Sequence, residues 1–362
     1  MQLQMRPLAA GHRARVASAT RPQRLARNRL VVRAELEEID PITGQPISRA
    51  ALTSPVAGNK AKVGNVEWAY RLATPEPSKA SADKPDVLLI HGLGSSSYSY
   101  RNTLGLLGGE GYRAFAPDWP GHGDSDKPAP SSFGYREEDY IEGLGRFVEG
   151  VGIKKPFAMV VQGYILSQYA LLWAQENPGM VERLLILNTP LALNAKLRPE
   201  LAAYKAALPF MRPGNKPFDF MIFNMQGSPY AMQEKDAMTY ARATSDPAAT
   251  TALSKTMDGV DFPKLLQKVD DGFMSWRKPS ICMFGSSDPF IPIDSVFAFL
   301  DNKRTNMKAL TAAAKLGHMP QEDYPEALQE NMVKWLQGET DKDVQLKNLA
   351  VLKMTKKGVV QG

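Results

Sequence analysis

Short apolar runs alternate with amphipathic stretches along most of the chain. Apolar runs bounded by Gly, Pro, Asn or Asp predict strands, and the residues concerned are 65–72, 87–90, 113–116, 157–161, 181–187 and 281–284. Apolar positions three or four residues apart predict helices, at 98–107, 137–151, 164–175 and 296–300. This alternation predicts an α/β protein with a mainly parallel twisted sheet and helices on both faces.

The stretch 191–278 interrupts the alternation. It is rich in Ala, Met and aromatic residues, and no strand pattern continues through it. Because a long excursion in a compact domain is usually functional, we expect a helical cap over a pocket. Most of its large apolar side chains pack the cap against the body, and a few line the pocket. The crowded side chains are Phe210, Met211, Phe218, Phe220, Met221, Phe223, Met225 and Tyr230.

The cap divides a core of residues 61–190 and 279–338. A polar segment that we expect to be flexible, 35–60, precedes this core, and a charged tail, 339–362, follows it. In the tail, residues 344–354 are weakly amphipathic and predict a frayed terminal helix. Contact of this stretch with a membrane surface, such as that of the thylakoid, is the alternative.

Positive charge is concentrated at the N-terminus. The 362 residues have a formal net charge of +6, but residues 1–34 hold eight arginines and no Asp or Glu, which leaves 36 basic against 38 acidic residues. We therefore expect no nucleic-acid partner. The leader lacks the apolar core of a secretory signal, so it predicts an organelle transit peptide. Its end, Val32-Arg33-Ala34, resembles chloroplast cleavage sites and predicts a stromal location. A mitochondrial peptide and a retained basic arm are the alternatives.

Other classes of site are not indicated. The single cysteine, Cys282, precludes an intrachain disulfide, and its apolar surroundings predict a buried small residue. With four histidines and neither an HExxH motif nor paired cysteines, we expect no metal and no other cofactor. No apolar run is long enough to span a membrane. The oligomeric state is left open.

Characteristic motifs follow the predicted strands. They are HGLG at 91–94, DWPGHGDSDKP at 118–128, VVQGY at 160–164, FGSSDP at 284–289 and GHMP at 317–320. In this order they resemble the α/β-hydrolase superfamily, in its haloalkane dehalogenase and epoxide hydrolase-like branch. The resemblance implies the α/β-hydrolase fold, with the helical cap as an insertion.

The late motifs contain an acid and a base in the family's order. Asp288 follows a predicted strand and matches the family acid, while His318 matches the base. The carboxylate orients the imidazole, which takes a proton from a nucleophile or from water. Taken singly, Asp288 is better interpreted as a helix N-cap and His318 as a loop histidine, but the joint context favours the dyad. The resemblance gives His91 and His122 a role in bracing loops.

The nucleophile position is occupied by glycine. Related dehalogenases have VQDWGG where this chain has VQGYIL, so Gly163 stands in place of Asp and Tyr164 in place of Trp. Ser167 is the nearest hydroxyl, but a nucleophile elbow needs small residues two positions away, where Ile165 and Tyr169 stand. We interpret Gly163 as a vacant nucleophile position that retains the elbow's backbone angles.

These substitutions narrow the function. The resemblance implies an oxyanion hole formed by the backbone N–H groups of Leu93 and Tyr164. Dehalogenases use Asn and Trp at these positions, and epoxide hydrolases need the Asp nucleophile, so both activities are excluded. We expect hydrolase-like or lyase-like chemistry on a small apolar substrate, with His318–Asp288 as general base and no covalent nucleophile. The alternative is an inactive pseudoenzyme that binds a ligand or a partner.

Overall fold

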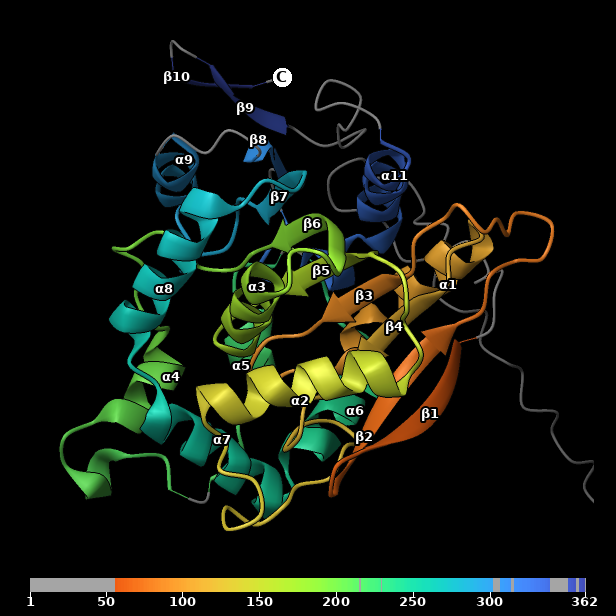
Figure 1. Ribbon diagram of the computed structural model, residues 1–362. Helices are drawn as coiled ribbons and strands as arrows, with labels where there is room; N and C mark the ends of the chain where they lie inside the picture. The colour runs from red at the N-terminus through yellow and green to blue at the C-terminus, as the bar shows by residue number, and fades with distance from the viewer. Residues whose placement is uncertain are drawn as a thin grey trace, which may run out of the picture. The chain divides into compact units, whose positions relative to one another are not determined.

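The apolar runs form strands of a ten-stranded sheet in the part of the chain that the structure describes (Figure 1). Its order is β1-β2-β4-β3-β5-β6-β7-β8-β9-β10. The strands from β4 to β8 are parallel, and β1, β2, β9 and β10 make the antiparallel pairs at the two ends. The strands are β1 (Val56–Val63), β2 (Val66–Ala73), β3 (Val87–Ile90), β4 (Ala114–Pro117), β5 (Phe157–Gln162), β6 (Val181–Leu187), β7 (Ser280–Gly285), β8 (Met307–Ala313), β9 (Val351–Thr355) and β10 (Gly358–Gln361).

The computed structural model describes residues 56–214, 216–228, 230–301, 307–313, 316–338, 351–355 and 358–361. The predicted transit peptide, most of the segment 35–60 and the first part of the predicted tail helix lie outside these residues. None of the described helices is long and apolar enough to cross a membrane.

Helices connect the strands. The α-helices are α1 (Arg101–Gly109), α2 (Glu137–Gly150), α3 (Leu166–Glu176), α4 (Pro199–Ala202), α5 (Phe220–Asn224), α6 (Glu234–Thr244), α7 (Pro247–Gly259), α8 (Phe262–Ser275), α9 (Ile293–Asp301), α10 (Pro320–Asp323) and α11 (Pro325–Leu336). Short 3-10 helices are η1 (Ser97–Tyr100), η2 (Ala203–Lys205) and η3 (Pro209–Met211). The stretch expected to form the cap contains α4 to α8 and, among its described residues, no strand.

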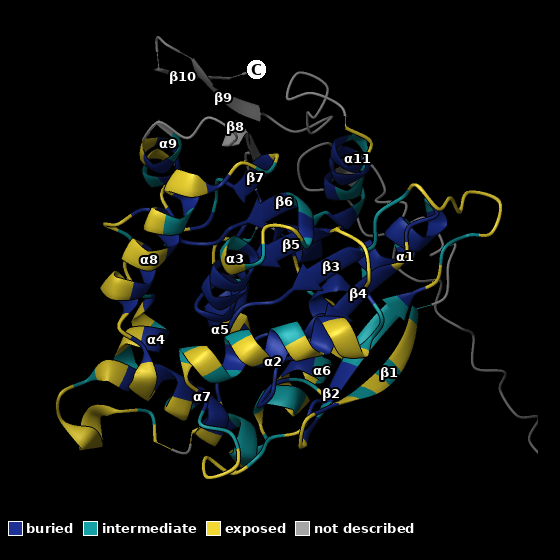
Figure 2. Ribbon diagram, viewed as in Figure 1, coloured by how far each residue is buried: buried dark blue, intermediate teal, exposed yellow. Residues whose placement is uncertain are grey.

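Successive residues of the central strands face opposite sides of the sheet. In β3, Leu88 and Ile90 belong to the core beneath α2, α3 and α8, whereas Val87 and Leu89 pack with α1 and α11. The predicted small core residue Cys282 is buried on the first side. Because both faces are covered, β3, β4 and β5 are buried along their length (Figure 2), and this is why they are almost entirely apolar.

The α/β-hydrolase fold class is confirmed, and β3 and β6 have the predicted bounds. Four strands were not predicted, namely β1, β8, β9 and β10. β1 is an exposed edge strand with Gly, Asn and Lys in its sequence, and β8 is rich in Ala. The helix predicted over 344–354 is wrong where the structure describes it, because β9 pairs with β8 there. Backbone pairing at a sheet edge outweighs the weak helical period.

A buried ionic cluster joins the cap to the core. Arg101 of α1 binds Asp236 of α6 at 2.8 Å and Glu322 of α10 at 2.5 Å. Tyr240 of α6 donates a hydrogen bond to the same Glu322 carboxylate. The two carboxylates are almost completely buried, so the guanidinium is their counter-charge.

Replacing this guanidinium tests whether the cluster holds the cap. Arg101→Ala should lower the free energy of unfolding by about 3–5 kcal/mol, because it leaves buried carboxylates uncompensated. Arg146→Ala removes an exposed pair with Glu142 and should cost about 1 kcal/mol or less. Urea unfolding followed by circular dichroism measures both variants, and equal losses would contradict this account.

Candidate active site

The predicted motifs converge at the carboxyl ends of the parallel strands. Leu93 follows β3, Gly163 follows β5 and Asp288 follows β7, while His318 lies in the loop between β8 and α10. In open α/β sheets, ligands bind at this edge. The order β3-β5-β6-β7-β8 therefore brings residues that are far apart in sequence to one place.

His318 and Asp288 are in direct contact. The imidazole Nδ1 lies 2.6 Å from Asp288 Oδ2, and both side chains are buried. The Phe290 N–H donates to Oδ1 at 2.9 Å, and the Asn188 side chain donates to Oδ2 at 3.1 Å. Burial alone would raise the pKa of the Asp288 carboxyl, but the imidazole and the two other donors outweigh it, so this pKa is lowered. Asp288 is thus an ionised partner for the imidazole.

Asn188 is a site residue that the sequence analysis missed. It follows β6 with a positive φ of 26°, and its side-chain oxygen accepts from the Gly285 N–H at 2.8 Å. The same amide group binds Asp288. An Asn directly after a strand is a common loop residue, so nothing in the sequence around it indicated a role at the site. It fixes the ends of β6 and β7 beside the acid.

The backbone around His318 is held from two sides. Gln162 at the end of β5 donates to the His318 carbonyl at 2.9 Å. The Asp323 carboxyl accepts from the Gly317 N–H and from the Ser228 hydroxyl, each at 2.5 Å. Burial raises the pKa of Asp323 to about 7, although these hydrogen bonds oppose the shift. The imidazole is therefore presented from a fixed loop.

The imidazole faces the glycine of the turn. Gly163 has a φ of +98°, and a Cβ atom built on it would lie 3.9 Å from His318 Nε2 and 3.0 Å from the Gly92 Cα. His318 Nε2 is buried and has no hydrogen-bond partner among the described residues. The imidazole Nε2 thus lies next to the side-chain position of Gly163, which we predicted to be the vacant nucleophile position.

The peptide after Gly163 departs from the expected geometry. Ile165 has φ 64° and ψ −70°, and the Leu166 N–H donates to the Tyr164 carbonyl at 2.8 Å, which is a strained γ-turn. The Leu93 N–H donates to the same carbonyl at 2.9 Å. The prediction that Leu93 contributes to an oxyanion hole is therefore contradicted, because its N–H is already bonded. This turn also delays the start of α3 to Leu166.

The other hydroxyl and imidazole groups that we considered have structural contacts. Ser167 donates to the Gln162 carbonyl at 2.5 Å, inside α3. His91 Nδ1 lies 2.8 Å from the Gly92 carbonyl, and His122 Nδ1 lies 3.3 Å from the Pro120 carbonyl. Burial lowers the pKa of His91 to about 4 and that of His122 to about 3. Both are neutral at pH 7 and brace their loops, as expected.

Aromatic rings surround the imidazole. The rings of Tyr164 and Phe223 have their centroids 5.7 and 6.1 Å from that of His318. Phe262 stacks on Tyr164, and Phe218 packs edge-on against Phe223. Phe218 and Phe223, two of the crowded cap residues, thus reach the site. Others are exposed at the surface: Phe210, Met211 and Met221.

Arg198 is a second residue that the sequence did not reveal. It lies just before α4 and is completely buried, and its Cζ lies 4.3 Å from the Phe223 ring centroid and 4.1 Å from that of Phe290. None of its guanidinium nitrogens has a hydrogen-bond partner among the described residues. An arginine next to Pro199 would ordinarily be assigned to the surface.

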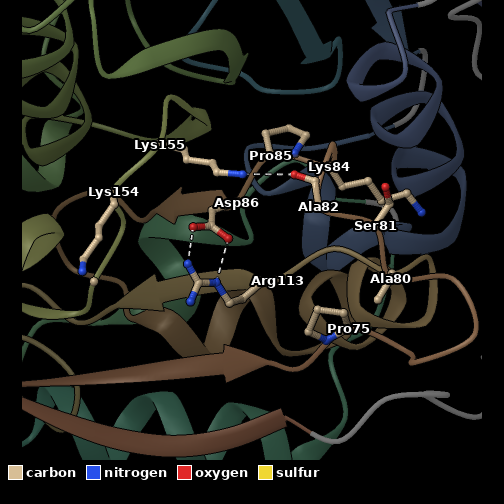
Figure 3. Close-up of a pocket in the computed structure, with 12 residues that line it drawn as sticks. Pro75, Ala80, Ser81, Ala82, Lys84, Pro85, Asp86, Arg113, Lys154 and Lys155 are labelled. Atoms are coloured by element: carbon tan, nitrogen blue, oxygen red, sulfur yellow. Dashed lines mark hydrogen bonds and ion pairs between the residues drawn. The ribbon is translucent and has the colours of Figure 1, made fainter.

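A large cavity lies away from the dyad. The cavity of about 510 Å³ in Figure 3 lies at the amino ends of the strands, where Asp86 precedes β3 and Arg113 precedes β4. Arg113 donates to Asp86 at 2.7 and 2.5 Å, and Lys155 donates to the Ala82 carbonyl at 3.3 Å. Arg113 and Lys155 thus have partners, and no histidine lies among the residues that line this cavity. The described residues contain no group of His, Cys, Asp or Glu suited to a metal ion.

A smaller cavity, of about 20 Å³, lies on the dyad side of the sheet. It is lined by Phe218, Gly94 and His122, together with residues of α6 and α7. Its volume matches a single water molecule. Neither member of the dyad lines it.

The fold and the site together define a hydrolase-like α/β protein. The chain belongs to the alpha/beta hydrolase family, whose model matches residues 87–330. This match includes both members of the dyad and the whole cap.

Curated relatives cover parts of the chain. It is 31% identical to the Magnesium-chelatase 30 kDa subunit of Rhodobacter capsulatus over 161 residues, which are 43% of this chain and 52% of that protein. It is 32% identical to Epoxide hydrolase 1 of Siraitia grosvenorii over 106 residues, which are 29% of this chain and 34% of that protein. The matched part thus spans about half the length of these relatives or less.

A solved structure has the same fold over a longer range. The haloalkane dehalogenase DbeA from Bradyrhizobium elkani superposes with a TM-score of 0.67, covering 78% of this chain and 98% of that chain. The two sequences are 21% identical, so this likeness concerns the fold.

Adding a side chain at the turn tests the elbow geometry. Gly163→Ser should lower the free energy of unfolding by about 1–3 kcal/mol, because a non-glycine residue at this φ is strained and its Cβ would press on Gly92. Gly179→Ser is the matched control, since a Cβ there meets nothing within 4 Å. Urea unfolding compares the two variants. A Gly163 variant as stable as the control would show that the turn is unstrained.

Proposed function

We propose that the chain is a hydrolase-like or lyase-like enzyme in which His318 and Asp288 form a general base that acts without a covalent nucleophile. One observation carries the proposal: His318 Nε2 is buried, has no partner among the described residues and points to the side-chain position of Gly163. A water molecule or an acidic group of a small, mostly apolar substrate placed there would meet a base already oriented by Asp288.

In the hydrolytic form, His318 Nε2 accepts a proton from water while the resulting hydroxide adds to the electrophilic carbon. The imidazolium then returns this proton to the leaving group, and Asp288 stays ionised throughout. In the lyase-like form, the same nitrogen takes a proton from a carbon of the substrate, the C–H electron pair forms a double bond as the neighbouring bond to the leaving group breaks, and the imidazolium returns the proton to that leaving group. General-base catalysis of this kind typically contributes about 10²–10⁴-fold. The names of the epoxide hydrolase and chelatase relatives supply no substrate for this chain, because the matches cover only part of each protein.

The alternative is a pseudoenzyme that binds a ligand or partner without chemistry. The bond between the Leu93 N–H and the Tyr164 carbonyl favours it, because this bond occupies one of the two donors that would stabilise an oxyanion. Loss of one such donor typically costs about 10²–10³ in rate. The two proposals therefore differ in whether the dyad alone sustains turnover.

Substitution of the dyad separates them. Turnover of short-chain p-nitrophenyl esters should fall about 10²–10⁴-fold in His318→Ala, because the base is removed, and strongly in Asp288→Asn, because the imidazole loses its charged partner. Asp83→Asn, an exposed carboxyl, is the control. The assay is initial-rate spectrophotometry. Unchanged rates in both dyad variants, or no turnover of any ester, would favour the pseudoenzyme.

We also propose a chloroplast location, with residues 1–34 removed on import. The support is the arginine-rich, acid-free composition of this segment and its Val32-Arg33-Ala34 end. N-terminal sequencing of the protein isolated from its source organism should find a mature chain that begins close to Glu35. A chain that still begins at Met1 would overturn the proposal.

A further inference from the structure

Three buried polar groups gather around one phenylalanine of the cap. The Phe223 ring centroid lies 4.3 Å from Arg198 Cζ and 6.1 Å from the ring centroids of both Tyr164 and His318. The Arg198 guanidinium nitrogens, the Tyr164 hydroxyl and His318 Nε2 have no hydrogen-bond partner among the described residues. All three side chains are completely buried. The dyad thus accounts for only one of the unpaired groups at this site.

A buried guanidinium without hydrogen bonds is costly. Glu200 is its nearest counter-charge, but the Nε–Oε2 distance of 3.8 Å is too long for a hydrogen bond. Phe223 and Phe290 pack against Arg198 through their ring faces, which leaves the N–H groups at the edge of the guanidinium plane. Such an edge matches a planar carboxylate, which accepts two parallel hydrogen bonds.

We propose that Arg198 binds the carboxylate of a substrate whose remaining body is apolar and lies among the cap aromatics beside His318. That this ligand is a substrate rests on the proposed function, whereas binding of its carboxylate requires no turnover. Tyr164 is the second donor. Because burial raises the pKa of its hydroxyl, the phenol remains protonated at neutral pH and can donate to an anion.

The surroundings select a monoanion with an apolar body. One guanidinium and one phenol serve the site, and Glu200 and Asp288 already place negative charge near Arg198. A dianion such as a phosphate monoester would add more negative charge than this single cation balances. The rings of Phe223, Phe290 and Tyr164 instead offer contact to a hydrocarbon chain or ring.

Octanoate and octanamide are the probes, since they share shape and apolar area but differ in charge. In the intact protein, isothermal titration calorimetry should show octanoate binding at least tenfold more tightly than octanamide. Equal affinities, or no binding of octanoate, would overturn the proposal. This comparison needs no substitution, so it stands even where a variant fails to fold.

Substitution then locates the binding group. Arg198→Met should lose at least tenfold in octanoate affinity and leave octanamide binding unchanged. Glu200→Gln should bind octanoate as tightly as the intact protein or more so, because it removes a competing carboxylate. Arg212→Met is the control, since Arg212 is a partly exposed cap arginine paired with Asp258. Full octanoate affinity in Arg198→Met, or an equal loss in Arg212→Met, would overturn the assignment.

The same titration separates this inference from the proposed function. His318→Ala should abolish turnover but still bind octanoate, because the carboxylate contacts Arg198 and Tyr164. If turnover persists in His318→Ala while Arg198→Met still loses octanoate, the catalytic proposal fails and the anion site stands. If turnover depends on His318 but the octanoate affinity is unchanged in Arg198→Met, the catalytic proposal stands and the anion site fails.

Discussion

The hydrogen bond between His318 and Asp288 sets the main constraint on this structure. A carboxylate in the interior is stable only when donors replace the water that it has lost. Asp288 has three such donors, the imidazole, the Asn188 amide and the Phe290 N–H, and they come from the chain beyond β8, β6 and β7. These strands are neighbours in the sheet, so the order of the parallel strands and the ionised state of the acid depend on one another.

The two ring nitrogens of His318 have different surroundings. The dyad is satisfied on its Nδ1 side and open on its Nε2 side, and one backbone donor beside it is bonded to the Tyr164 carbonyl. Stabilisation of a developing negative charge therefore depends on groups other than Leu93. Arg198 is the only cationic side chain among the described residues that is fully buried, and it touches the same aromatic wall as the imidazole. Phe223 of the cap therefore packs against both the buried cation and the imidazole.

Much of the fold and part of the site could be predicted from sequence. Strand β3 was placed correctly because burial on both faces makes it continuously apolar, and β6 because its last four residues form a buried apolar run. His318 and Asp288 were paired because their motifs resemble, in order and context, those of the α/β-hydrolase superfamily. Leu93 was assigned wrongly, since the partner of a backbone N–H depends on the orientation of the 164–165 peptide, which no residue pattern specifies. Arg198 was missed because burial of a charged residue is a property of the packed cap. Strand β9 was not predicted because its five residues are too few to show strand alternation against the helical spacing of residues 344–354.

The γ-turn at Ile165 means that covalent catalysis at this site would require two coupled changes. A new side chain at position 163 would supply a reagent, but the Tyr164 carbonyl would still hold the Leu93 N–H. Rotation of the 164–165 peptide would free that donor, yet without a nucleophile the freed donor would have no covalent intermediate to stabilise. Each change therefore gains its full value only in the presence of the other. A covalent mechanism at this turn would need both at once, a side chain at position 163 and a rotated 164–165 peptide.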